Sequence, residues 1–122
     1  MNCPICKTTL EQAGRTFACG TCNGAWVKAE VLVPMLEERA STLVALEWQA
    51  VAEDLHRACP ECGAPMETVK LGHVTLDRHE AHGVWFDNKE LAELLKEAKH
   101  FKADLPPHEG LLHKLRRIFA RD

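Results

Sequence analysis

The six cysteines of the chain form three pairs, and in each pair two residues separate the partners. They are Cys3 and Cys6, Cys19 and Cys22, and Cys59 and Cys62. Two histidines, His79 and His82, have the same spacing. Paired thiolates and imidazoles are the donors that a tetrahedral zinc ion prefers. We therefore predict two Zn²⁺ ions per chain, the first bound by Cys3, Cys6, Cys19 and Cys22 and the second by Cys59, Cys62, His79 and His82.

Six cysteines could instead form three disulfides, which persist in an oxidising compartment. The chain offers no address for such a compartment, because Met1 is followed by Asn2, Cys3 and Pro4 rather than by a basic stretch and an apolar core. It also has no run of about 18 apolar residues, so we expect no membrane-spanning helix. These features favour a cytoplasmic protein with reduced cysteines.

The ligand pairs belong to an internal repeat. A first copy opens with the letters CPIC and ends near Trp26, and a second copy opens with CPEC and ends near Trp85. Each copy has a glycine, Gly14 or Gly72, between two short runs with apolar residues, which is typical of a β-hairpin. Such a hairpin would bring the two ligand pairs of a copy together. A copy of about 30 residues is too small for a hydrophobic core alone, so we expect zinc to stabilise it.

The region between the copies, residues 29–58, is predicted to be a helical linker. Over residues 41–58 apolar side chains recur at intervals of three and four, which indicates an amphipathic helix. Trp48 would lie on its apolar face, in the core or in a homodimer contact. Pro34 makes the conformation of residues 28–38 ambiguous, because a proline either starts a helix at the first turn or kinks one.

Two further helices are predicted after the second copy. Asp87 and Glu90 have the spacing of a capping box, in which Asp87 accepts from the backbone at the third helical position and Glu90 reaches back. We therefore expect a helix over residues 88–104. A Pro-Pro break then introduces a basic amphipathic C-terminal helix within residues 105–122.

The predicted fold is a small α+β protein. It has two zinc-ribbon β-hairpin modules, residues 1–28 with four cysteine ligands and residues 59–87 with two cysteines and two histidines. Amphipathic helices join and flank these modules.

The order of motifs in the second copy is specific. After CPEC come Leu76-Asp77-Arg78, then Gly83-Val84-Trp85-Phe86-Asp87, then Glu90-Leu91. This order resembles the transcription-factor-IIB-type zinc-ribbon family of bacterial small proteins, with His79 and His82 in place of two cysteines. The first copy keeps four cysteines, Gly24 and Trp26 but departs from the family pattern where the helix should start. The resemblance implies zinc binding and a ribbon fold, and it implies little about activity.

We expect no catalytic metal site. A catalytic zinc has three protein ligands and keeps a position for water, whereas each predicted site has four ligands. Glu80 directly follows His79, which is not the H-x-E order of the zinc deaminases. The cysteine pairs also lack the βαβ context of a thioredoxin-like redox motif. A redox or hydrolytic enzyme is therefore the less favoured alternative to a structural protein.

The formal net charge of −3 at pH 7 disfavours a protein that wraps phosphate backbones. We predict that the chain acts through protein contacts, with the transcription machinery as a candidate partner. The alternative is direct nucleic-acid binding through Arg15, Lys70, Arg78, Arg116 and Arg117. The basic C-terminal helix has three alternatives: it docks on this protein or a second subunit, binds another protein, or lies on an anionic membrane surface.

The two repeated tryptophans also have alternatives. Trp26 and Trp85 could stack on nucleic-acid bases, but we expect each to pack against its own ribbon and the helix that follows. His73 is expected at the tip of its hairpin. The remaining histidines have no ligand-like spacing and are expected at the surface or in packing; they are His56, His100, His108 and His113.

Overall fold

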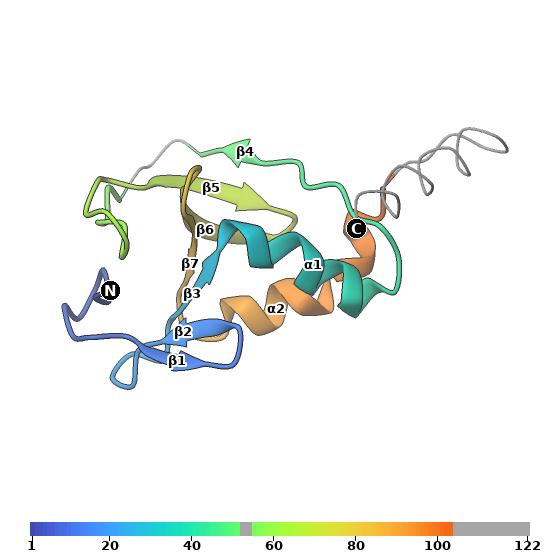
Figure 1. Ribbon diagram of the computed structural model, residues 1–122. Coiled ribbons are helices and arrows are strands. Elements are labelled where there is room, and N and C mark those ends of the chain that lie inside the picture. The colour runs from blue at the N-terminus through green and yellow to red at the C-terminus, as the bar shows by residue number, and fades with distance from the viewer. Residues whose placement is uncertain (52–54, 104–122) are drawn as a thin grey trace, which may run out of the picture.

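One antiparallel β-sheet runs through both copies of the repeat (Figure 1). The computed structural model describes residues 1–51 and 55–103, and over these residues the sheet has seven strands. The first copy contributes β1 (Glu11–Ala13), β2 (Thr16–Ala18) and β3 (Ala25–Lys28), and the second copy contributes β5 (Glu67–Leu71), β6 (Val74–His79) and β7 (Gly83–Phe86). A short strand, β4 (Gln49–Ala50), pairs with β5 at the edge, so the order is β1-β2-β3-β7-β6-β5-β4.

The two copies meet where β3 pairs with β7. In this antiparallel pair Trp26 lies opposite Trp85, and Val27 lies opposite Val84. Because Trp26 and Trp85 hold the same place in the repeat, the pairing is symmetric about them. The small α+β class is confirmed. The division into two separate modules is not, because the strands of both copies form one sheet.

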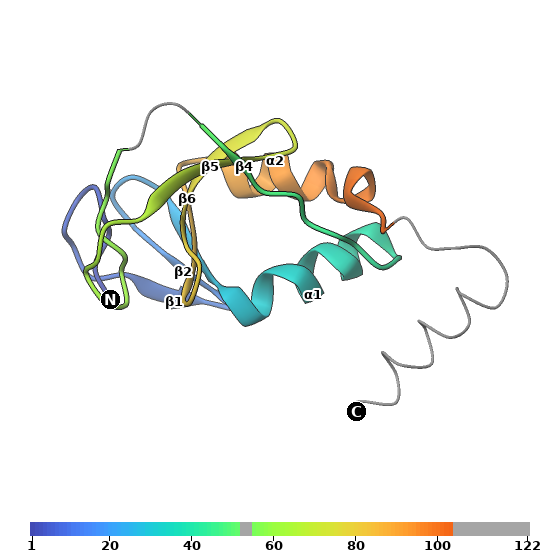
Figure 2. The same cartoon turned by 90° about the horizontal axis from the view of Figure 1, so that it is seen from above.

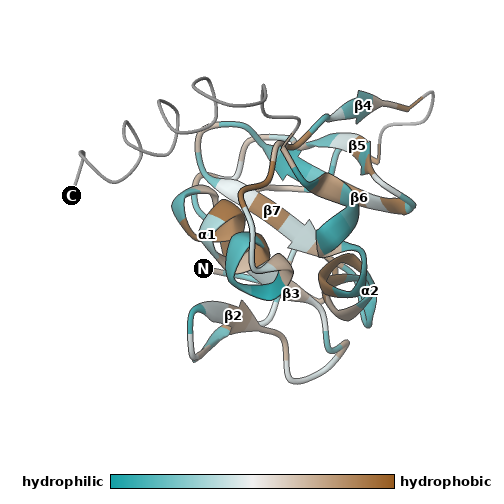
Figure 3. Cartoon of the chain, turned by 90° about the vertical axis from the view of Figure 1, so that its right-hand side faces the viewer, coloured by the Kyte–Doolittle hydropathy of each residue, from teal (hydrophilic) through white to brown (hydrophobic). Residues whose placement is uncertain are grey.

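The two faces of the sheet bury different side chains. Helices α1 (Ala29–Ala40) and α2 (Glu90–Lys96) and the 3₁₀ helix η1 (Ala98–Phe101) pack on one face, over a core of aliphatic and aromatic side chains. Figures 1 and 2 show α1 and α2 on this side of the sheet, and the loops that carry the cysteines on the other side. In Figure 3 brown, hydrophobic segments are seen on α1, α2 and β7. A second buried cluster on the loop side contains Trp26, Trp85, Leu10, Met66, Cys3, Cys19 and Cys59.

Helix α1 settles the question that Pro34 left open. The helix continues through Pro34 and ends at Ala40, with Ser41 in the left-handed conformation after it. Leu32, Leu36 and Ala40 recur every four residues and are buried in the helix-side core. Burial of this apolar stripe therefore outweighs the backbone hydrogen bond that the proline removes.

The helix predicted over residues 41–58 is wrong. The described part of this segment contains no helix, and it includes the strand β4. Val44, Leu46 and Trp48 are half-buried against the helix-side core, while the residues between them are exposed. Val44 and Trp48 fit the helical period, but with Leu46 between them they also fit a period of two, and the segment continues into β4, which pairs with β5.

The predicted homodimer contact depends on a helix around Trp48, and the described residues there form no helix. The Trp48 ring lies under the guanidinium of Arg78, 4.5 Å from the ring centre to the guanidinium carbon. This contact holds the segment before β4 to β6, the next strand but one in the sheet, through a cation–π interaction.

The helix predicted over residues 88–104 is shorter and is split into α2 and η1. Half of the predicted capping box is present, because the Asp87 N–H donates to Glu90 Oε1 at 2.7 Å. The other half is absent, since the Asp87 carboxylate instead accepts from Arg57 and from the Trp85 indole. The predicted C-terminal helix within residues 105–122 lies outside the described part of the chain. Of the helices in the described part, none has the length and apolar character needed to cross a membrane.

Candidate metal centres

Each cysteine pair lies in a tight turn whose backbone is built in the same way. The N–H of the residue after the second cysteine donates to the carbonyl of the first cysteine, and this residue has a positive φ. The donors are Lys7 at 2.9 Å (φ 64°), Asn23 at 2.9 Å (φ 61°) and Gly63 at 2.8 Å (φ 77°). The N–H of the second cysteine also points at the first sulfur, at 3.3 Å in the pair Cys3–Cys6. Such donors stabilise a thiolate and hold its sulfur in place for a metal.

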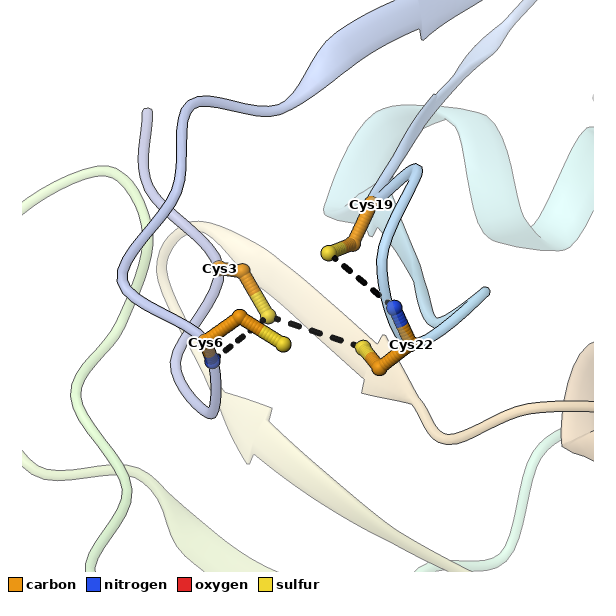
Figure 4. A group of neighbouring side chains, drawn as sticks. All are labelled: Cys3, Cys6, Cys19 and Cys22. Atoms are coloured by element: carbon orange, nitrogen blue, oxygen red, sulfur yellow. Dashed lines mark hydrogen bonds between the residues drawn. The ribbon is translucent and has the colours of Figure 1, made fainter.

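The first predicted site comes together on the loop side of the sheet (Figure 4). The sulfurs of its four predicted ligands, Cys3, Cys6, Cys19 and Cys22, all lie within 4.8 Å of one another. Cys3 Sγ and Cys22 Sγ are 3.7 Å apart. Two sulfurs bound to one tetrahedral zinc at about 2.3 Å would be about 3.8 Å apart. The four cysteines therefore fit a zinc ion without rearrangement of the loops.

The second predicted site is assembled from the turn at residues 59–63 and the end of β6. The ligand atoms of Cys59, Cys62, His79 and His82 also lie within 4.8 Å of one another. Cys59 Sγ is 3.7 Å from His82 Nδ1, and the two imidazoles stack with ring centres 4.4 Å apart. Among the described residues, His79 Nδ1 is the buried side-chain polar atom without a hydrogen-bond partner. Coordination to a metal ion would give this nitrogen the partner that it lacks.

The thiols of the first site differ in acidity when no metal is bound. The backbone N–H of Cys22 and the hydroxyl of Thr8 lower the pKa of Cys19 to about 6, so this sulfur is a thiolate at neutral pH. Burial raises the pKa of Cys6 to about 12, and the neighbouring thiols act in the same direction. Zinc binding at neutral pH must therefore displace protons, and metal affinity will fall as the pH is lowered.

The two sites differ in exposure and in charge. Cys3 and Cys19 are buried, whereas Cys62 in the second site is exposed. With Zn²⁺ bound, four thiolates leave the first site with a formal charge of about −2, while two thiolates and two neutral imidazoles leave the second near zero. The second site is therefore the more accessible and the less charged of the two.

The tryptophans lie on the metal side of the sheet but contact the opposite copy. A Cβ on Gly24 would lie 2.2 Å from the Trp85 ring, and a Cβ on Gly83 would lie 2.9 Å from the Trp26 ring. Each tryptophan therefore covers the glycine of the other copy, and both are fully buried. The prediction that each packs against its own ribbon is confirmed, since the same cluster contains Cys19 beside Trp26 and Cys59 beside Trp85. The predicted packing against the following helix is wrong, because the helices lie over the other core. Their burial also leaves no ring face free for a nucleic-acid base.

A polar network centred on Arg57, a residue that no motif in the sequence singles out, supports the second site. Arg57 Nη1 donates to Asp87 Oδ1 at 2.9 Å and to Asp77 Oδ2 at 3.2 Å. Thr68 donates to the other oxygen of the buried Asp77 at 3.1 Å, and Trp85 Nε1 donates to Asp87 at 3.1 Å. The network thus fixes β5, β6 and the end of β7 around the second site.

The arginines considered for nucleic-acid binding have acidic partners wherever the structure describes them. Arg15 pairs with Glu38 at 2.7 Å, and Arg78 pairs with Glu67 at 3.0 Å. Lys70 is half-buried in β5, while Arg116 and Arg117 lie outside the described residues. At the second hairpin tip, His73 Nδ1 and Glu97 Oε1 are 2.7 Å apart, so this tip is held against the residue between α2 and η1.

Comparison with known proteins agrees with the second site. Residues 58–97 match the model of the TFIIB-type zinc-ribbon family, which is described as a transcription factor zinc-finger. No curated protein and no solved structure gives a significant match to the chain. The matched segment contains all four ligands of the second site, while the first site lies outside it. The resemblance seen in the motifs of the second copy is therefore confirmed, and residues 58–97 match the TFIIB-type zinc-ribbon family.

Proposed function

We propose that the protein binds two structural zinc ions and acts as a non-catalytic scaffold for protein contacts in the cytoplasm, in transcription or its regulation. The observation that carries the proposal is the convergence of four donors at each site, within 4.8 Å in both. Four protein ligands fill a tetrahedral zinc and leave no position for a substrate or a reactive water. The bound metal would supply rigidity to loops that are too short to form a core.

Metal analysis of the full chain, purified in reducing buffer, tests the first part of this proposal. We expect two zinc ions per chain, and an X-ray absorption spectrum with an average shell of three sulfurs and one nitrogen per zinc. A content of one zinc or none would contradict the proposal. A zinc-bound water in the spectrum would instead favour a catalytic site.

The transcription part rests on the family match of residues 58–97 and on fold analogy. It is tested by binding of the full chain to purified RNA polymerase, compared with a chain that ends at Leu105. We expect the full chain to bind the polymerase. If the basic tail takes part in this binding, the shorter chain should bind more weakly. Binding that occurs only with free DNA or RNA, and that falls steeply with salt, would favour the nucleic-acid alternative. Arg15 and Arg78 already pair with acidic side chains of this protein, which disfavours the nucleic-acid alternative.

A further inference from the structure

We infer that Glu61 couples the two metal centres, so that a metal at the second site strengthens metal binding at the first, and the reverse. Glu61 is not a metal ligand in either site. It belongs to the CPEC turn of the second site, yet its carboxylate holds a tryptophan of the first copy. The inference rests on the proposed binding of two zinc ions.

The coupling contact is a hydrogen bond between the two copies. Trp26 Nε1 donates to Glu61 Oε2 at 2.9 Å. Trp26 is fully buried, whereas Glu61 is an exposed residue between Cys59 and Cys62. The position of the Glu61 carboxylate therefore depends on the conformation of a turn whose two cysteines would bind the second metal. If that turn moves, the buried indole N–H loses its partner, which is costly.

The repeat explains why Trp26 takes its acceptor from the other copy. Trp85 donates its indole N–H to Asp87 in its own copy. The place of Asp87 is taken in the first copy by Lys28, which cannot accept a hydrogen bond. The place of Glu61 is taken in the first copy by Ile5, which offers Trp85 no acceptor. These replacements make the link run from Trp26 to Glu61 and give it no symmetric counterpart.

Trp26 is linked to the first metal centre by packing and through its strand. It belongs to the same buried cluster as Cys3 and Cys19, and it lies opposite Phe17 in the strand pair β2–β3. The ligand Cys19 donates its N–H to the carbonyl of Gly24, two residues before Trp26, at 3.0 Å. A shift of Trp26 would therefore move the strand that positions the second ligand pair of the first site.

The other turn of the second site also contacts the first copy's side of the sheet. The carbonyl of His82 accepts from the N–H of Ala29, the first residue of α1, at 2.9 Å. Gly83 packs so closely against Val27 and the Trp26 ring that a Cβ would lie 2.3 Å from the Val27 oxygen. A metal at the second site would join this turn to the turn that holds Glu61. Loading it would thus fix both contacts with the first copy at once.

Coupling between two sites is reciprocal in free energy, and it typically changes affinity between about 5-fold and 150-fold. We therefore expect the first site to bind metal at least about five-fold more tightly when the second site is loaded. The first site can be followed separately with Co²⁺, because the thiolate-to-cobalt absorption is stronger for four thiolates than for two. The second site can be blocked by Cys62→Ser, which removes its most exposed ligand.

The experiment is a Co²⁺ titration of the full chain in reducing buffer, with the second site intact or blocked by Cys62→Ser. Each titration is repeated in Glu61→Ala, which removes the acceptor, and in Glu61→Gln, which keeps an oxygen for the indole. Glu80→Ala is the matched control, because it removes an exposed carboxylate from the other turn of the same site. We expect the effect of blocking to be clearly smaller in Glu61→Ala, where only the His82 and Gly83 contacts remain, and to be kept in Glu61→Gln and Glu80→Ala.

A second measurement keeps the test valid if Glu61→Ala does not fold. With Glu61 in place, the indole N–H of Trp26 should exchange with water at least about five-fold more slowly in the unmodified chain with both sites loaded than in Cys62→Ser with only the first site loaded. Two metals that bind with affinities independent of each other would overturn the coupling. A coupling of unchanged size in Glu61→Ala, or one that Glu80→Ala reduces equally, would overturn the role of Glu61. Fewer than two bound metals would instead contradict the proposed function.

Discussion

Trp26 on β3 lies directly opposite Trp85 on β7, and each ring covers the glycine that precedes the other tryptophan by two residues. The Gly-x-Trp motif of each copy is therefore explained by the opposite copy. A glycine is needed because the ring occupies the space of a side chain, and a tryptophan is needed to fill the gap between the sheet and both sets of cysteines. The two metal centres consequently share one buried cluster.

Gly24→Ala should destabilise the zinc-loaded protein by about 1–3 kcal/mol, because the new methyl group would overlap the Trp85 ring. Gly20→Ala is the matched control, since an added Cβ there meets no atom within 4 Å. Urea unfolding at fixed zinc concentration measures both. Equal stability of Gly24→Ala and the unmodified chain would mean that Trp85 does not cover Gly24.

Arg57→Ala should lower the free energy of unfolding by about 1–3 kcal/mol, because it leaves the buried carboxylate of Asp77 without its ion-pair partner. The cost stays below that of a fully buried pair, since Arg57 and Asp87 are partly exposed. Arg15→Ala, which breaks the exposed pair with Glu38, should change stability by less than about 1 kcal/mol. Thermal unfolding of the two variants would contradict this account if their midpoints shifted equally.

Protonation of Glu90 should make the stability of the protein depend on pH. Burial raises the pKa of Glu90, partly offset by the hydrogen bond from the Asp87 N–H. Between the ordinary pKa and the raised native pKa, the folded state holds a proton that the unfolded state has lost. The contribution of Glu90 to stability is therefore greatest below the ordinary pKa and decreases as the pH rises through this window.

The substitution Glu90→Gln should remove this slope, because glutamine does not titrate but keeps an oxygen for the Asp87 N–H. Its stability relative to the unmodified chain should rise with pH across the window and then level off. Glu93→Gln, at an exposed position of the same helix, is the control. Urea unfolding of each chain at matched pH and zinc concentration gives the difference. A carboxyl NMR titration with an unshifted Glu90 pKa would refute the prediction.

Removal of metal with a chelator should unfold both halves of the sheet, because neither set of loops has a core of its own large enough to hold it. The fluorescence of the buried Trp26 and Trp85 should shift to longer wavelength as water reaches them. Adding Zn²⁺ back should restore the original spectrum. An apo protein with unchanged fluorescence and circular dichroism would show that the sheet does not depend on metal.

The clustering of the eight predicted ligands into two groups was predictable from the sequence, because spacing is a local property of the turn that presents two donors to one ion. The hairpins were predictable for the same reason, through Gly14 and Gly72. The segment that contains Val44, Leu46 and Trp48 was not. Val44 and Trp48 fit both a helical and an alternating period, and contacts with distant residues, of Val44 with Lys102 and of β4 with β5, decide between them.

The contacts between the copies were also beyond sequence reasoning. The sequence of one copy does not show which strand of the other copy will pair with it, so it predicts only the packing of Trp26 and Trp85 on their own ribbons. One signal was available: the acidic residue that follows Trp85 by two is replaced by Lys28 after Trp26. A buried indole N–H without a local acceptor requires a distant one, and the structure provides it in Glu61.

The symmetric pairing of β3 with β7 has a consequence for how the protein responds to dilution. Two separate ribbons joined by these strands would dissociate at low concentration, whereas a linker that spans them makes the association intramolecular, with an effective concentration set by the chain. A symmetric homodimer must also carry the same residue at both equivalent places. Because the two copies are joined in one chain, this constraint does not apply here. Equivalent places can carry different residues, such as Ile5 and Glu61 or Lys28 and Asp87, so each half of the sheet can take a separate role.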